Sequence, residues 1–139
     1  MISNADNISG KKAVAINSTL SDATIHQSIS LLKKAMNDDK LYLNPNLNLA
    51  LIAEHTGIAQ KIISTVLNQH LNKSFNEFVN DYRIEAFKEK ILQPEMDNLT
   101  IAGIAFECGF NSQATFQRTF KQATGVSPSE FRKGALQIQ

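Results

Sequence analysis

The stretch LNLALIAEHTGI at residues 47–58 returns as LTIAGIAFECGF at residues 99–110, so part of this chain is repeated. After one inserted residue, QKIISTVLNQHLNKSFNEF at 60–78 aligns with QATFQRTFKQATGVSPSEF at 113–131. The residues of the first copy that are identical in the second are Leu47, Ala50, Ile52, Ala53, Gly57, Gln60, Gln69, Ser74, Glu77 and Phe78. Each copy predicts a short apolar helix, a turn with Gly and a second helix, which is the helix-turn-helix pattern.

Apolar spacing and composition together predict an all-α protein. The chain has 139 residues, which is long enough to form a hydrophobic core. Its hydrophobic content of 42% is ordinary for a globular protein. Apolar residues recur at helical spacing, and no segment alternates as a strand would. No apolar run is long enough to cross a bilayer or to act as a signal peptide. The single Cys108 cannot form an internal disulfide, which agrees with a reducing compartment.

Caps and breaks in the helical pattern divide the chain into four segments. The predicted helix caps are Asn48, Thr100 and either Asn111 or Ser112, and the predicted capping boxes are Ser74-Phe75-Asn76-Glu77 and Ser127-Pro128-Ser129-Glu130. Residues 1–21, rich in Asn, Ser and Asp, are predicted to form a mobile tail. Residues 22–40 are predicted to form a connector helix that begins near Asp22. Residues 41–92 are predicted to form a first helix-turn-helix lobe that includes a long linking helix, and residues 93–139 a second lobe.

Charge is unevenly distributed between the two predicted lobes. Residues 41–98 carry five Lys or Arg against seven Asp or Glu, whereas residues 99–139 carry four against two. The net charge of +1 is low for a nucleic-acid binder, which usually carries a basic surface. If DNA is the partner, the second lobe should therefore contact phosphates better than the first.

Three motifs follow one another in the second copy. They are the pair Gly109-Phe110, the core Phe116-Gln117-Arg118-Thr119-Phe120-Lys121, and the ending Gly125-Val126-Ser127-Pro128-Ser129-Glu130-Phe131-Arg132. In this order they resemble the signature region of AraC/XylS-type transcription regulators. The likeness extends over about 41–135 and includes Asn80-Asp81-Tyr82-Arg83 in the linking helix.

The resemblance implies sequence-specific binding of double-stranded DNA, with one recognition helix per lobe in successive segments of the major groove. The positions it implies for base contacts are Lys61, Ser64, Thr65, Gln113, Ala114, Gln117 and Arg118. The resemblance also places Gln60 near the DNA backbone. Ser112, Thr115 and Lys121 suit contacts with phosphates better than contacts with bases. Further candidates for phosphate contacts are Lys61, Lys73, Arg132 and Lys133. Arg118 is the strongest candidate because Arg donates two hydrogen bonds to guanine. The alternatives for Arg118 are a phosphate contact or a salt bridge to Glu107.

Three positions depart from the family pattern. Ala59 stands where a helix-capping Ser is usual, so the first recognition helix lacks a cap worth about 1 kcal/mol. Ala114 replaces a polar contact, although its methyl group can pack on thymine. Asn72 replaces Gly, and Asn tolerates the left-handed conformation. The first lobe is therefore the weaker candidate for sequence recognition.

Other functional classes have less support in the sequence. His26, His55 and His70 lack Asp or Cys neighbours at ligand spacing, so we expect no metal site. No catalytic arrangement stands out, so we expect no enzyme and no cofactor, and Cys108 is interpreted as a small buried residue. The main alternative is a helical protein-interaction module that keeps the scaffold without DNA affinity. The resemblance implies RNA polymerase as a further partner, an upstream sensor or membrane domain if the chain is a fragment, and a location in the cytoplasm or on the cytoplasmic side of a membrane.

Overall fold

Seven α-helices make up the part of the chain that the structure, a computed structural model, describes. The description covers the backbone of residues 20–138 and the side chains of residues 20–135. The helices are α2 (Asp22–Asn37), α3 (Leu49–Thr56), α4 (Gln60–His70), α5 (Phe75–Ile91), α6 (Ile101–Glu107), α7 (Gln113–Thr124) and α8 (Pro128–Ile138). Residues 20–138 contain no strand, which confirms the all-α prediction. Residues 1–19 of the predicted tail lie outside the described residues.

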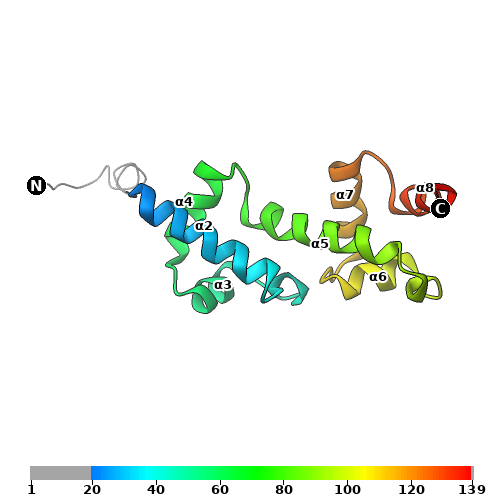
Figure 1. Ribbon diagram of the computed structural model, residues 1–139, viewed down its shortest axis with the longest axis horizontal. Coiled ribbons are helices and arrows are strands. Elements are labelled where there is room, and N and C mark those ends of the chain that lie inside the picture. Colours follow the sequence, from blue (N-terminus) through cyan, green and yellow to red (C-terminus); the bar gives the residue numbers. More distant parts are fainter. Residues whose placement is uncertain (1–19, 139) are drawn as a thin grey trace, which may run out of the picture.

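The first lobe has its own hydrophobic core, built by α2, α3, α4 and the first half of α5 (Figure 1). Its buried members are Leu32, Met36, Tyr42, Ile52, Ile63, Val66, Leu67, Phe78 and Val79. Helix α2 supplies Leu32 and Met36, whose side chains are both fully buried. The predicted connector helix is therefore packed on the first lobe.

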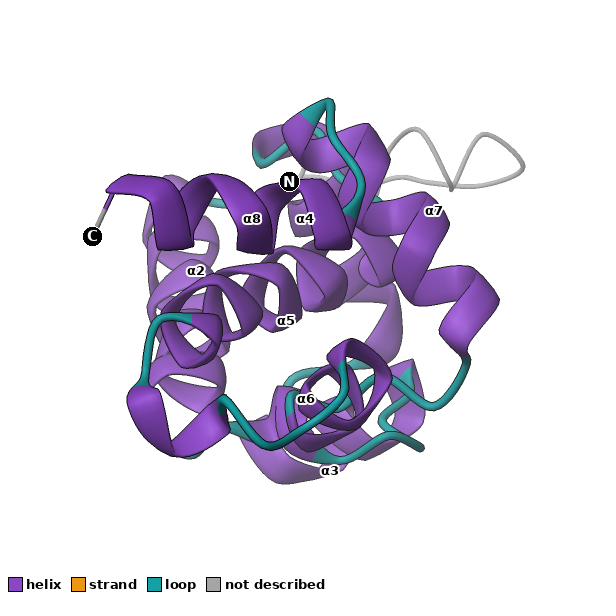
Figure 2. Cartoon of the chain, turned by 90° about the vertical axis from the view of Figure 1, so that its right-hand side faces the viewer, coloured by secondary structure: helices purple, strands orange, loops and turns teal. Residues whose placement is uncertain are grey.

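The second lobe forms around the other half of α5, where α6 and α7 pack on the helix and α8 packs on α7 (Figure 2). Aromatic rings fill its core. Phe120 lies 5.3 Å from Phe87, 5.8 Å from Phe116 and 5.4 Å from Phe131, measured between ring centroids. These tilted and edge-on pairs add to the stabilisation that burial of the rings provides.

Helix α5 belongs to both cores. Phe78 and Val79 near its start are buried in the first core, whereas Phe87 and Ile91 near its end are buried in the second. Ala86 packs against both clusters. The linking helix is thus a shared wall of two cores, and the lobes have little freedom to move along it.

The predicted caps explain where most of the helices begin. Asn48, Thr100 and Ser112 each accept a hydrogen bond from a backbone N–H in the first turn of the next helix. Ser74 forms a complete capping box with Glu77, and α8 begins with the same pair of hydrogen bonds between Ser127 and Glu130. These hydrogen bonds confirm the predicted caps, with Ser112 rather than Asn111 before α7.

Three other helix ends bear on the sequence-based predictions. The cap of α2 is Ser21, one residue before the predicted Asp22, which instead lies in the first turn. Ala59 offers α4 no side-chain hydrogen bond, as expected. Asn72 has φ of 57°, which confirms the left-handed conformation.

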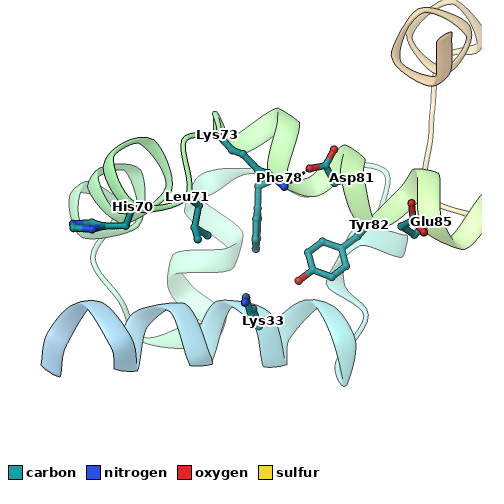
Figure 3. Close-up of a pocket in the computed structure, with 8 residues that line it drawn as sticks. All are labelled: Lys33, His70, Leu71, Lys73, Phe78, Asp81, Tyr82 and Glu85. Carbon is teal, nitrogen blue, oxygen red and sulfur yellow. Dashed lines mark hydrogen bonds and ion pairs between the residues drawn. The ribbon is translucent and has the colours of Figure 1, made fainter. Parts of the chain in front are cut away.

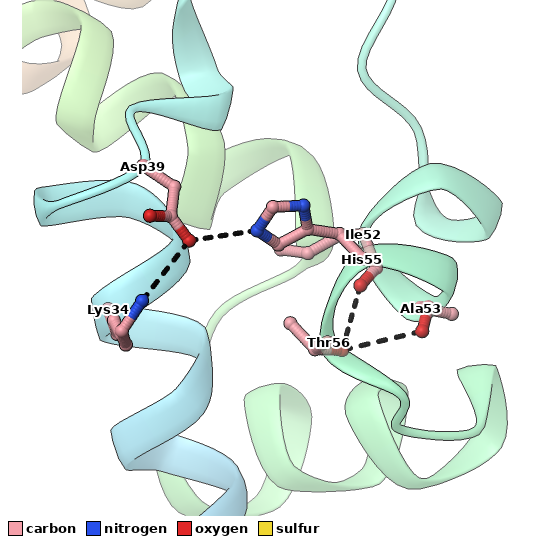
Figure 4. Close-up of polar contacts among 6 residues, drawn as sticks. All are labelled: Lys34, Asp39, Ile52, Ala53, His55 and Thr56. Atoms are coloured by element: carbon pink, nitrogen blue, oxygen red, sulfur yellow. Dashed lines mark hydrogen bonds and ion pairs between the residues drawn. The ribbon is translucent and has the colours of Figure 1, made fainter.

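A polar contact joins the end of α2 to α3 (Figure 4). The Asp39 carboxylate lies 2.8 Å from His55 Nε2 and 3.5 Å from Lys34 Nζ. The hydrogen bond with His55 is the main cause that lowers the pKa of Asp39. His55 therefore has an acidic partner that lies 16 residues away in sequence, which local ligand spacing did not reveal.

Candidate nucleic-acid interface

Each lobe contains a helix-turn-helix unit whose turn is made by Gly. Gly57 follows α3 with φ of 77°, and Gly109 follows α6 with φ of 104°. This left-handed region favours Gly, and it allows the chain to reverse into α4 or α7 within a few residues. The second helices of the two units, α4 and α7, pack on different halves of α5, α4 on the first half and α7 on the second (Figure 1).

Helix α7 presents a polar face to solvent. Gln113, Ala114, Gln117, Arg118 and Lys121 are all exposed, whereas Phe116 and Phe120 on the opposite side are fully buried. No ion pair joins Arg118 to Glu107 in the described part of the chain, so the guanidinium is available to an outside partner. The structure therefore brings together the predicted base-contacting residues of the second lobe on one surface.

Ser112 and Thr115, which are predicted to contact the DNA backbone, lie at the start of α7. The Ser112 hydroxyl oxygen accepts a hydrogen bond from the Thr115 N–H at 3.2 Å, and both residues are half-buried. The hydroxyl of Ser112 thus caps the helix and can still donate its proton outward. The predicted phosphate contacts of Ser112 and Thr115 remain predictions.

Helix α4 presents a smaller polar surface than expected. Gln60 and Lys61 are exposed and Ser64 is half-buried, but Thr65 is only 7% exposed. A base contact requires an exposed side chain, and the expectation that Thr65 is exposed together with Lys61 and Ser64 was wrong, because packing of the lobe buries it. A base contact from Thr65 remains a prediction that the buried position does not favour.

Two cations named as phosphate contacts are used within the fold. Arg132 donates from Nη1 to the Leu99 carbonyl and from Nη2 to the Met96 carbonyl, both at 3.3 Å. It thereby ties α8 to the segment before α6, so we no longer expect it to bind phosphate. Sequence reasoning missed this role because the acceptors are backbone carbonyls more than 30 residues away.

Lys73 is the second of these cations. Its ammonium pairs with Asp81 at the rim of a cavity of about 480 Å³ between α2 and α5 (Figure 3). Phe78 and Tyr82 also line this cavity. A lysine held in an ion pair loses that pair when it binds phosphate, so Lys73 is a weaker candidate than Lys61 or Lys121.

The remaining candidates for chemical reactivity are Cys108 and possible metal ligands. Cys108 is fully buried, and burial raises the pKa of its thiol to about 11, so the unreactive thiol form prevails at neutral pH. Within the described residues, no group of three or more His, Cys, Asp or Glu side chains is placed to hold a metal ion. Among the described helices, none combines the length and apolar character that a bilayer crossing requires.

Comparison with known sequences gives the chain relatives over most of its length. A sequence model of the helix-turn-helix domain matches residues 52–134. An uncharacterized HTH-type transcriptional regulator of Staphylococcus aureus (strain COL) is 33% identical over 118 residues, which cover 78% of this chain and 15% of that protein. The arabinose operon regulatory protein of Escherichia coli (strain K12) is 35% identical over 89 residues, covering 64% of this chain and 30% of that protein. The chain thus spans a minor part of the length of both relatives.

Solved structures share the arrangement of the helices. The C-terminal domain of AraT, a response regulator from Geobacillus stearothermophilus, matches with a TM-score of 0.62 and 27% identity, over 84% of this chain and 88% of that one. A transcriptional regulator with an AraC-type DNA-binding domain from Chromobacterium violaceum matches with a TM-score of 0.65 over 82% of this chain and 99% of that one. The second match is 21% identical and supports the fold.

Proposed function

The chain belongs to the AraC-type family of helix-turn-helix DNA-binding domains of transcription regulators, and from this premise we propose that α4 and α7 recognise DNA sequence in successive segments of the major groove. The observation that carries the proposal is the exposed polar face of α7. A helix that is apolar inward and carries Gln, Arg and Lys outward can place those groups against base edges and phosphates. Family membership identifies a domain that binds DNA and has no catalytic task.

Roles within α7 follow from side-chain chemistry and position. Arg118 is exposed and can donate two hydrogen bonds to guanine, while Gln117 can pair with adenine and the Ala114 methyl can pack on thymine. Lys121 lies one turn further along and suits a phosphate, which positions the protein without selecting sequence. In α4, Lys61 and Ser64 are the residues best placed for base contacts, with Gln60 at the DNA backbone.

The length of α5 fits the spacing of two major-groove segments. A helix of 17 residues spans about 26 Å at 1.5 Å per residue. Because α4 and α7 pack on different halves of it, α5 holds the two recognition helices apart along one direction, as two half-sites one helical turn (~34 Å) apart on DNA require. One chain could therefore occupy two half-sites on one face of the duplex.

Partners beyond DNA are proposed from the family. The AraT domain is described as the C-terminal domain of a response regulator, and this chain covers a small share of its sequence relatives. We therefore propose that the domain works with an upstream sensor or membrane domain and contacts RNA polymerase on the cytoplasmic side. Recovery of RNA polymerase with the DNA-bound chain would test the second contact.

The alternative function is a helical protein-interaction module without DNA affinity. The acidic balance of residues 41–98 favours it, because like charge repels phosphate. Selection of bound sequences from random duplexes by the purified chain separates the two functions. Enrichment of a defined site supports DNA recognition, and failure to bind any duplex at low salt supports the alternative.

Changing Arg118 to Ala should weaken binding to the selected site by about 1–3 kcal/mol and relax the preference at one base pair. The reason is the loss of a two-bond contact with one base. The measurement is affinity for the selected duplex and for single-base variants of it. Lys121→Ala is the matched control, and it should weaken binding to selected and random duplexes alike. Equal losses on both duplexes in the Arg118 variant would assign Arg118 to a phosphate instead.

Salt dependence should be modest for a DNA-binding protein. With Arg132 engaged in the fold, contacts through Lys61, Lys121, Lys133 and helix N-termini amount to about four or five phosphates. The logarithm of the binding constant should then fall against the logarithm of salt concentration with a slope between about −3.5 and −4.5. Lys121→Ala should reduce the magnitude of the slope by about 1. A slope near about −10 would contradict this count of contacts.

A further inference from the structure

The two lobes touch each other away from the axis of α5. On the first-lobe side, Tyr42, Asn44 and Pro45 lie in the segment before α3. On the second-lobe side, Gly109, Phe110 and Asn111 form the turn between α6 and α7. Arg83 of α5 lies between the two segments, and we name this set of seven residues the junction.

Arg83 contacts both sides of the junction. Its Nε donates to the Tyr42 carbonyl at 2.8 Å, and its Nη2 donates to the Asn44 carbonyl at 2.9 Å. The guanidinium carbon lies 5.9 Å from the centroid of the Phe110 ring, within the range of a cation–π contact. Burial lowers the pKa of the Arg83 guanidinium, which agrees with its withdrawal from water.

A hydrogen bond from the Asn111 side chain and the close approach of Gly109 join the two lobes directly. The Asn111 side-chain amide donates to the Pro45 carbonyl at 3.0 Å, across 66 residues of sequence. A Cβ atom built on Gly109 would lie 2.1 Å from the Tyr42 carbonyl oxygen and 2.8 Å from Arg83 Nε. The second-lobe turn therefore approaches the first-lobe segment as closely as a backbone without a side chain allows.

A contact away from the helix axis has a mechanical consequence. Packing of the two cores on α5 opposes both sliding and rotation of the lobes, and contacts that lie farther from the helix axis oppose rotation with a longer lever arm. Such a rotation would shift α7 relative to α4. The direction in which each recognition helix presents its polar face therefore depends on the junction as well as on α5.

We propose that Arg83 and Asn111 are positioning residues that hold α4 and α7 at one relative offset and thereby set the half-site separation that the chain accepts. This inference rests on the proposed function, since half-sites exist only if both helices recognise DNA. The orientation of the lobes can nevertheless be measured without DNA, so an experiment can contradict the role of the junction without contradicting the proposed function, and the reverse.

The first experiment measures the distance between the lobes in the free chain. Spin labels are attached through Gln69→Cys and Gln122→Cys, which are exposed and equivalent positions of the repeat. Cys108 should remain unlabelled because its thiol is buried and has a pKa of about 11. The wild-type distance distribution should be narrow, and Arg83→Lys and Asn111→Ala should each broaden it.

Arg132→Lys is the matched control, since Arg132 also donates to backbone carbonyls but within the second lobe alone. It should lower thermal stability without broadening the distribution. If Arg83→Lys fails to fold, Asn111→Ala alone tests the junction. This variant should fold, because Asn111 is exposed and lies outside both hydrophobic cores. Distributions as narrow as wild type in the folded junction variants, or equal broadening in the control, would overturn the proposal.

The second experiment uses the duplex that the wild-type chain selects from random sequences, with one base pair inserted or removed between its half-sites. Each such change rotates one half-site by about a tenth of a turn. Wild type should lose about tenfold in affinity, and the junction variants should lose less than about threefold, relative to their own optimum. An unchanged spacing penalty overturns the role of the junction. Failure of wild type to select any duplex overturns the proposed function instead, while the distance measurements still decide whether the junction holds the lobes.

Discussion

Phe120→Ala should unfold the second lobe and abolish DNA binding through loss of structure. Phe120 is fully buried and its ring meets those of Phe87, Phe116 and Phe131. Truncation of a buried Phe costs about 3–5 kcal/mol, a large share of the 5–15 kcal/mol that typically stabilises a domain. Thermal and denaturant unfolding, followed by circular dichroism, would measure the loss.

Phe106→Ala supplies the control for this prediction. It is the same chemical change in the same lobe, but the Phe106 side chain is 50% exposed. Its effect on the free energy of unfolding should stay within about 0.5 kcal/mol. An unchanged melting temperature in the Phe120 variant would show that the aromatic cluster is not the core of the lobe.

Insertion of five base pairs between the selected half-sites should remove most of the specific affinity. Five base pairs turn one half-site to the opposite face of the duplex, about half a helical turn away. A chain whose recognition helices are both packed on α5 cannot reach both faces of the duplex. Titration of the inserted and original duplexes at one salt concentration would measure the loss.

A ten-base-pair insertion distinguishes a rigid from a flexible linker. It restores the face but adds about 34 Å, more than the length of α5 itself, so we expect no recovery of affinity. Recovery of affinity on this duplex would indicate that the two lobes can move apart from each other. Unchanged affinity after five inserted base pairs would show that one lobe alone recognises DNA, and the smaller polar surface of α4 makes the first lobe the one without that role.

Features set by local sequence were predictable. Both helix-turn-helix units, the Ser74 and Ser127 capping boxes and the left-handed Asn72 depend on a few neighbouring residues, so their patterns can be recognised directly. The exposed face of α7 was likewise predictable, because the spacing of Phe116 and Phe120 defines the opposite side of the helix.

Features that depend on distant segments were not predictable. Thr65 has a polar neighbourhood in sequence, yet packing buries it. Arg132 ends a motif of the family, but nothing local shows that its donors reach carbonyls of Leu99 and Met96. The pair of His55 and Asp39 and the junction around Arg83 also join residues that are remote in sequence. In each case the partner is fixed only after the lobes fold.

The two turn glycines illustrate how assembly makes equivalent positions unequal. Gly57 and Gly109 occupy the same place in the repeat and both have positive φ, yet an added Cβ would meet nothing within 4 Å at Gly57. At Gly109 the same atom would collide with the Tyr42 carbonyl. Sequence drift can therefore replace Gly57 by Asn, which accepts left-handed backbone. Gly109 has no such substitute, because any side chain there would meet the Tyr42 carbonyl, so one half of the repeat tolerates a change that the other half forbids.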